Sequence, residues 1–116
     1  MADITEPEQR KARIRALNDA LRRGECTNGK VLLTSGIHER GEPFVAAVVR
    51  GVMHFDDFGE DNDPHREHDF GALEVEGERV FFKVDYYDET LQWLSPDPAD
   101  PSVTKRVLTI MLAHEY

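Results

Sequence analysis

Residues 72–87, ALEVEGERVFFKVDYY, are the stretch that decides the fold. Residues 72–76 alternate apolar and polar side chains, Gly77 stands at a turn, and residues 79–87 are rich in aromatic and β-branched side chains. This pattern is typical of a β-hairpin with one face packed against a core. We therefore predict paired strands at 72–76 and 79–87, followed by a short third strand at 90–94.

Helical patterns dominate the chain before this hairpin. Thr5 and Glu8 have the spacing of a capping box, and apolar residues then recur on one helical face at Ile14, Leu17 and Leu21, which predicts a helix over 6–23. Residues 30–34, KVLLT, read as a short strand, and residues 35–42 as a polar loop. Pro43 can open a second helix, although several β-branched valines in 45–52 also permit a strand.

The C-terminal segment reads as a third helix. Asp100 suits an N-cap and Pro101 a first helical position. Apolar side chains in 103–112 would cover most of the circumference of that helix, as in a buried helix. The order of elements predicts one α+β domain over 1–116, with a small antiparallel sheet of three to four strands packed with three helices.

Composition restricts the classes of partner. The 116 residues carry a net charge of −9, with seven Lys/Arg and five Asp/Glu in 1–30 but seven and eighteen in 31–116. An acidic body repels phosphate backbones, so we expect no direct binding of duplex nucleic acid. It favours a protein with a basic surface instead. The lone Cys26, the charged N-terminus and the lack of a long apolar run predict a cytoplasmic protein with no membrane partner.

Residues 54–69, here called the acidic loop, carry seven carboxylates and three histidines. Imidazole and carboxylate ligands together suit a transition-metal ion, so a divalent metal is one interpretation. The spacing matches neither a calcium EF-hand nor an HEXXH motif, and an acidic surface loop explains the composition equally simply. We therefore predict no cofactor, and keep His68, Asp69 and Asp85 as the candidate metal ligands.

A second polar cluster ends the hairpin at residues 85–89, DYYDE. Tyrosine beside carboxylate is a good recognition pair, although either tyrosine could pack in the core with its hydroxyl bonded to an acid. Together the two clusters give the candidate binding residues. These are Asp57, Glu60, Asp61, Asp63, Glu67, His68, Asp69, Asp85, Tyr87 and Asp88.

Several strings in order resemble a known bacterial family, the domain of unknown function DUF3768. They are DDF at 56–58, DNDP at 61–64, EHDFG at 67–71, DYYD at 85–88 and RVLTIMLA at 106–113. The resemblance implies a small protein, common in alphaproteobacterial genomes and plasmids, with no settled activity, and it transfers no catalytic residue. It also implies an aromatic residue and a glycine where this chain has His65 and Arg66, which argues against His65 as an essential ligand.

The leading functional hypothesis is a non-catalytic protein-binding module whose acidic surface engages a basic groove. An inhibitor carried on a mobile element and acting on a nucleic-acid-binding groove would fit this description. The alternatives are a metal-dependent enzyme, for example a hydrolase, that uses His68, Asp69 and Asp85, and a homodimeric interaction protein.

Overall fold

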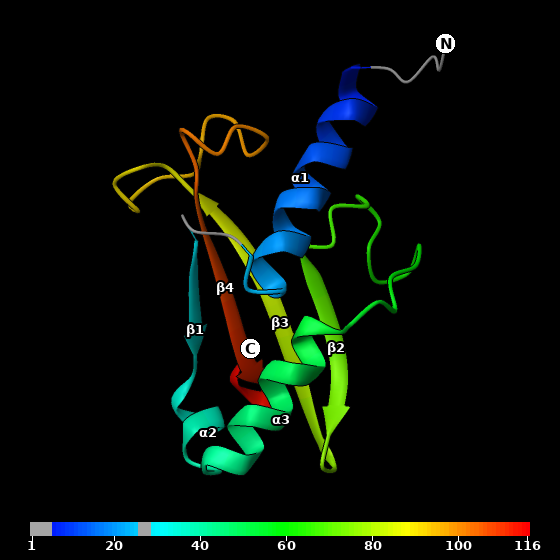
Figure 1. The fold of residues 1–116 in the computed structure, drawn as a ribbon, viewed down its shortest axis with the longest axis vertical. Coiled ribbons are helices and arrows are strands. Elements are labelled where there is room, and N and C mark those ends of the chain that lie inside the picture. The colour runs from blue at the N-terminus through cyan, green and yellow to red at the C-terminus, as the bar shows by residue number, and fades with distance from the viewer. Residues whose placement is uncertain (1–5, 26–28) are drawn as a thin grey trace.

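The computed structural model describes residues 6–25 and 29–116 (Figure 1). Thr5 and Cys26, which entered the predictions above, lie outside these residues. In chain order the elements are α1 (Glu6–Arg22), β1 (Lys30–Leu33), α2 (Ser35–His38), α3 (Glu42–Met53), β2 (Phe70–Val75), β3 (Glu78–Tyr87), β4 (Lys105–Leu112) and a terminal 3-10 turn (Ala113–Glu115). No helix among the described residues is long and apolar enough to cross a bilayer.

The four strands form one sheet in the order β1-β4-β3-β2. The hairpin pairs β2 with β3 through Gly71 and Phe82, and β3 pairs antiparallel with β4, with Phe82 opposite Ile110. Strand β1 lies parallel to β4, with Leu33 opposite Ile110. The α+β class, with four strands and three α-helices among the described residues, is confirmed, but this parallel pair makes the sheet mixed rather than antiparallel.

The helices cover one face of the sheet, where the core forms (Figure 1). The core contains side chains from β3 and β4 that alternate toward the helices, among them Phe82 and Ile110, each 1% exposed or less. Helix α3 contributes Val48 and Val52 from one face, as its periodicity predicts. On the opposite face of the sheet, the Tyr116 ring packs near the rings of Phe70 and Phe81.

The predicted C-terminal helix is wrong, because residues 105–112 form strand β4. The strand lies between β1 and β3, so both of its edges are hydrogen-bonded, and side chains on both of its faces are buried. Val107 and Met111 are buried on one face, and Leu108 and Ile110 on the other. A strand buried on both faces has a continuous apolar sequence, which periodicity alone cannot distinguish from a buried helix.

Two shorter predictions also need correction. Residues 90–94 form no strand: only one isolated bridge joins Tyr87 to Leu94, and the segment belongs to a loop of residues 88–104, here called the tip loop. Within the predicted loop 35–42, residues 35–38 form the single-turn helix α2, whose Ile37 is fully buried. The helices predicted at 6–23 and from Pro43, and the strands predicted at 30–34, 72–76 and 79–87, are confirmed to within about two residues.

Candidate functional site

The acidic loop joins α3 to β2 and runs beside α1 (Figure 1). Its carboxylates fall into two groups. Asp57, Glu60 and Asp61 are exposed, as expected for a binding surface. Asp63 is only 4% exposed, and its Oδ1 accepts the backbone N–H groups of Glu67 and His68 at 3.1 Å each. The inner part of the loop therefore has a structural role that its composition does not reveal.

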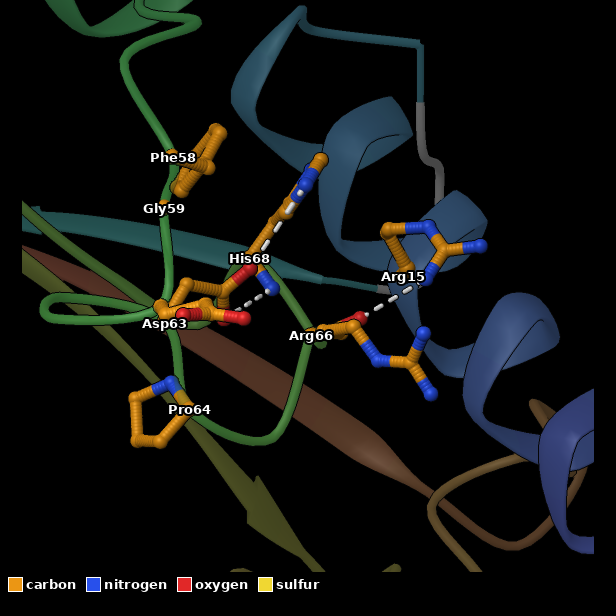
Figure 2. A pocket seen from close by; sticks show the side chains of 8 residues that line it. Arg15, Phe58, Gly59, Asp63, Pro64, Arg66 and His68 are labelled. Carbon is orange, nitrogen blue, oxygen red and sulfur yellow. Dashed lines mark hydrogen bonds and ion pairs between the residues drawn. The ribbon is translucent and has the colours of Figure 1, made fainter.

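His68 connects the acidic loop to α1 through Asp19, and Figure 2 shows its contact with Asp63 inside the loop. Its Nδ1 lies 2.8 Å from Oδ1 of Asp19, and its Nε2 lies 3.6 Å from Oδ2 of Asp63. The imidazole also stacks on the ring of Phe58, with centroids 3.8 Å apart and planes 5° apart. Both ring nitrogens thus face carboxylates of the protein, which fixes the orientation of the ring.

Arg22 continues this set of contacts into the core. It is 3% exposed, and its Nη2 donates to Oδ1 of Asp19 at 2.7 Å. Its Nη1 donates to the backbone carbonyls of Val52 and Phe55 at 2.9 Å each. The guanidinium carbon also lies 5.2 Å from the centroid of the Phe58 ring, a favourable cation–π distance. Arg22 therefore joins α1, the end of α3 and the acidic loop.

A second polar network, centred on Asn18, lies under the same helix. Asn18 is fully buried, and its Nδ2 donates to the carbonyl oxygen of Glu67 at 3.0 Å and to the hydroxyl oxygen of Tyr86 at 2.8 Å. The Tyr86 hydroxyl donates to Oε1 of Glu67 at 2.8 Å, and Arg106 Nε donates to Oδ1 of Asn18 at 2.8 Å. Burial raises the pKa of Tyr86, so its phenol stays a donor.

The carboxylate of Asp19 makes the folded state sensitive to acid. Burial alone would raise its pKa, but the hydrogen bonds and positive charges of Arg22 and His68 outweigh burial and hold the pKa below the ordinary value of 3.8. A carboxylate with a lowered folded pKa stabilises the fold above its unfolded pKa, and this contribution is lost as the pH falls through the folded value.

We expect Asp19→Asn to lower the free energy of unfolding by about 2 kcal/mol at neutral pH, because charge-assisted hydrogen bonds are lost. The difference from the unmodified protein should begin to shrink at about pH 4, where the Asp19 carboxylate of the unfolded chain becomes protonated, and it should vanish below the lower folded pKa, where the carboxylate is protonated in both states. Urea unfolding at a series of pH values measures both quantities. A difference that stays constant between neutral pH and strong acid would contradict this prediction.

The three candidate metal ligands are not brought together. His68 faces Asp19 and Asp63 on the helix-covered side of the sheet. Successive side chains of β3 point to opposite faces of the sheet, so Asp85, next to Tyr86, lies on the face away from the helices. There its Oδ2 is 2.6 Å from Lys83 Nζ. Burial raises the pKa of Asp69, which lies between them in the sequence. The described residues contain no group of three His, Cys, Asp or Glu side chains that could hold a metal.

The cluster at the end of the hairpin is divided in a similar way. Tyr87 lies on the same face of the sheet as Asp85 and is half-buried. Asp88 instead orders the first part of the tip loop. Asp88 Oδ1 accepts hydrogen bonds from the backbone N–H and the hydroxyl of Thr90 at 3.1 and 2.7 Å. These bonds lower the pKa of Asp88. Its backbone N–H donates to the carbonyl of Trp93 at 2.8 Å, which closes the turn.

The closed turn exposes apolar side chains. Trp93 is 71% exposed, Leu94 80% and Leu91 38%. The other end of the tip loop is fixed to the domain, since the Thr104 hydroxyl is buried and donates to the carbonyl of Asp97 at 2.8 Å. Trp93 and Leu94, the two most exposed of these side chains, therefore project from a loop whose two ends are held by hydrogen bonds.

A pocket of about 650 Å³ lies between α1 and the acidic loop (Figure 2). Two residues of its lining have left-handed backbones, with φ of 57° at both Arg66 and His68. Glycine adopts this conformation without steric cost, whereas other residues are strained in it. The glycine that the family resemblance implies in place of Arg66 thus has a backbone explanation. The pocket is lined by Arg15, Phe58, Gly59, Glu60, Asp63, Pro64, Arg66 and His68.

Arg15, Phe58, Trp93 and Leu94 were not among the functional residues predicted from the sequence. Leu94 and Trp93 were assigned to a strand that does not form, and only the tertiary structure brings Arg15 and Phe58 to the same pocket. The burial of Asn18 and Arg22 could have been predicted from the sequence. They lie four residues apart, on the same helical face as the buried Ile14 and Leu21.

The comparisons with known proteins agree with the resemblance noted in the sequence. The family model described as "Protein of unknown function (DUF3768)" matches residues 33–115. The chain belongs to the DUF3768 family. No curated protein matches the chain, and no solved structure matches it. The matched segment of this DUF3768 protein includes the acidic loop and the tip loop, whereas α1, which supplies Asn18, Asp19 and Arg22, precedes it.

Proposed function

We propose that this DUF3768 protein is a non-catalytic protein-binding module that docks through the tip loop. The observation that carries the proposal is the exposure of Trp93 and Leu94 on a backbone that is already ordered. Tryptophan is enriched among the residues that dominate binding energy at protein interfaces. Because the turn is held by Asp88, little conformational entropy would be lost when a partner covers these side chains.

Charge complementarity indicates what kind of protein the partner is. The tip loop contains four carboxylates and no Lys or Arg. Of these, Asp97 pairs with Arg10 at 2.9 Å, and Glu89 is exposed beside the turn. The complementary surface is an apolar pocket with a basic rim. A groove that otherwise holds nucleic acid has a rim of this kind, so an inhibitor of such a groove fits the proposal.

Replacement of the two exposed side chains tests the proposal. Trp93→Ala is expected to weaken binding to the partner by about thirtyfold or more, and Leu94→Ala by less, since hot-spot truncations cost about 2 kcal/mol or more. The partner would be isolated by photo-crosslinking from position 92, an exposed neighbour of Trp93, and its affinity would be measured by isothermal titration at low and high salt. Binding should weaken as salt rises, because its rim is charged.

Leu32→Ala is the matched control, because Leu32 is also an exposed leucine, at 51%, but lies on the edge strand β1. It should leave the affinity unchanged, and none of the three variants should alter the thermal unfolding of the free protein appreciably. A crosslinked partner with an acidic surface would contradict the proposal. Self-association abolished by Trp93→Ala would also contradict it, since the loop would then bind a second copy of the chain.

A further inference from the structure

The pocket beside α1 brings together two arginines that are far apart in the sequence (Figure 2). Arg15 comes from the middle of α1 and Arg66 from the acidic loop. Nη1 of Arg15 donates to the backbone carbonyl of Arg66 at 2.9 Å, so the first arginine holds the backbone that carries the second. The left-handed φ of Arg66 places a long charged side chain at a position where a non-glycine residue is strained.

The acidic side chains around the pocket are largely engaged already. Oδ1 of Asp63 accepts two backbone N–H groups, and its Oδ2 faces the ring of His68. Nδ1 of His68 is already hydrogen-bonded to Oδ1 of Asp19. Glu60 remains as the exposed carboxylate of the lining, which also contains the guanidinium groups of Arg15 and Arg66. Counting arginines and carboxylates, the lining therefore carries two positive and two negative charges, and one of the negative charges, on Asp63, is buried and already hydrogen-bonded.

We propose that this pocket binds a small molecule that carries a phosphate group. A planar carboxylate fills its hydrogen-bonding capacity with one bidentate guanidinium group. A tetrahedral phosphate dianion can accept hydrogen bonds from two guanidinium groups that come from different elements. Phe58 and Pro64 give the pocket an apolar wall, and its volume of about 650 Å³ exceeds that of phosphate alone. The ligand class is thus a phosphate ester with an apolar group. The site is separate from the tip loop, which lies on the other side of α1 in Figure 1.

Phenyl phosphate, inorganic phosphate and benzoate are the probes, titrated calorimetrically into the full chain at constant ionic strength set with chloride. Phenyl phosphate is expected to bind saturably and more tightly than either of the others, because it alone offers both the dianion and the apolar group. Arg15→Gln and Arg66→Gln should each weaken its binding at least tenfold. Arg23→Gln, an exposed arginine outside the pocket, is the control and should leave the binding unchanged.

Arg66→Gly separates binding from folding. Glycine relieves the left-handed strain, so the melting temperature of the free protein should not fall and is expected to rise, while the affinity for phenyl phosphate drops at least tenfold. The proposal is overturned if phenyl phosphate shows no saturable binding. It is equally overturned if benzoate binds as tightly, or if the Arg66 variants bind phenyl phosphate as tightly as the unmodified protein.

Discussion

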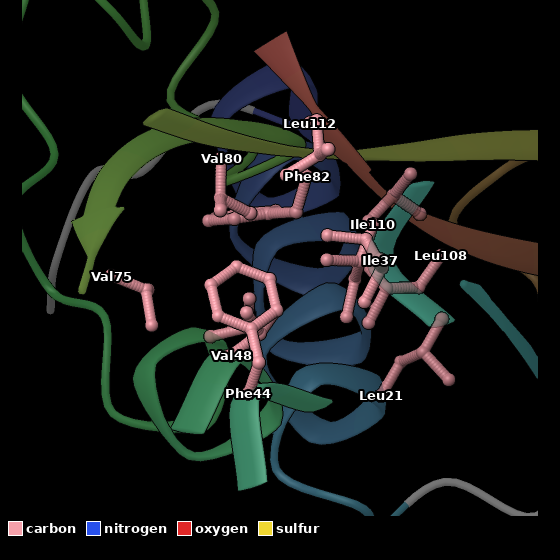
Figure 3. Close-up of a cluster of buried hydrophobic side chains, with 12 residues drawn as sticks. Leu21, Ile37, Phe44, Val48, Val75, Val80, Phe82, Leu108, Ile110 and Leu112 are labelled. Atoms are coloured by element: carbon pink, nitrogen blue, oxygen red, sulfur yellow. The ribbon is translucent and has the colours of Figure 1, made fainter. Parts of the chain in front are cut away.

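Replacing Ile110 with alanine is expected to lower the free energy of unfolding by about 2–5 kcal/mol, the range found for buried large-to-small substitutions. Ile110 is 1% exposed and lies in β4, where it pairs with Phe82 of β3 and Leu33 of β1. Figure 3 shows its side chain within the cluster of buried hydrophobic residues. Alanine would leave a cavity at the point where the sheet meets the helices. A domain of this size has only about 5–15 kcal/mol of stability, so urea denaturation should show a large shift of the midpoint.

Thr109→Ala is the control for this prediction. Thr109 precedes Ile110 in the same strand but faces the other side of the sheet and is partly exposed. Its replacement by alanine lowers strand propensity but leaves no cavity in the main core. The free energy of unfolding should therefore fall by less than about 1 kcal/mol. If Ile110→Ala costs no more than Thr109→Ala, then β4 is not the central strand of the core.

Replacing Asn18 with alanine is expected to cost about 3 kcal/mol or more. The side chain is fully buried and satisfies three groups at once: Arg106 Nε, the carbonyl of Glu67 and the hydroxyl oxygen of Tyr86. An unsatisfied buried polar group costs about 1–3 kcal/mol, and a charged one more, so the loss comes from the partners left behind rather than from the amide itself. Denaturant unfolding monitored by circular dichroism measures it.

The matched control is Arg13→Ala, an exposed position in the same helix. Arginine and alanine both favour helices, so this change should alter stability by less than about 0.5 kcal/mol. A small loss in Asn18→Ala, comparable to that of the control, would mean that water or a rearranged Arg106 satisfies the network. In that case the buried amide would not be what fixes α1 on the sheet.

Local pattern determined much of the secondary structure. The hairpin is predicted from 72–87 because apolar and polar side chains alternate around Gly77, which the structure places in the turn with a φ of 84°. Helices α1 and α3 are predicted because their buried residues recur every three or four positions. The exposed carboxylates Asp57, Glu60 and Asp61 follow from composition, since several like charges in one segment favour solvent.

Tertiary contacts decided the structural features that local sequence pattern did not predict. Residues 105–112 form a strand because β1 and β3 flank them, and a run of apolar residues fits a doubly covered strand as well as a buried helix. Which carboxylates of the acidic loop serve the fold depends on Asp19 and Arg22, more than 40 positions earlier in the chain than His68. Trp93 became a surface residue because Asp88 ends the strand in a hydrogen-bonded turn before it. Each of these outcomes depends on a residue far away in the sequence or on the competition between a turn and a strand. The periodicity of the segment itself predicts neither of them.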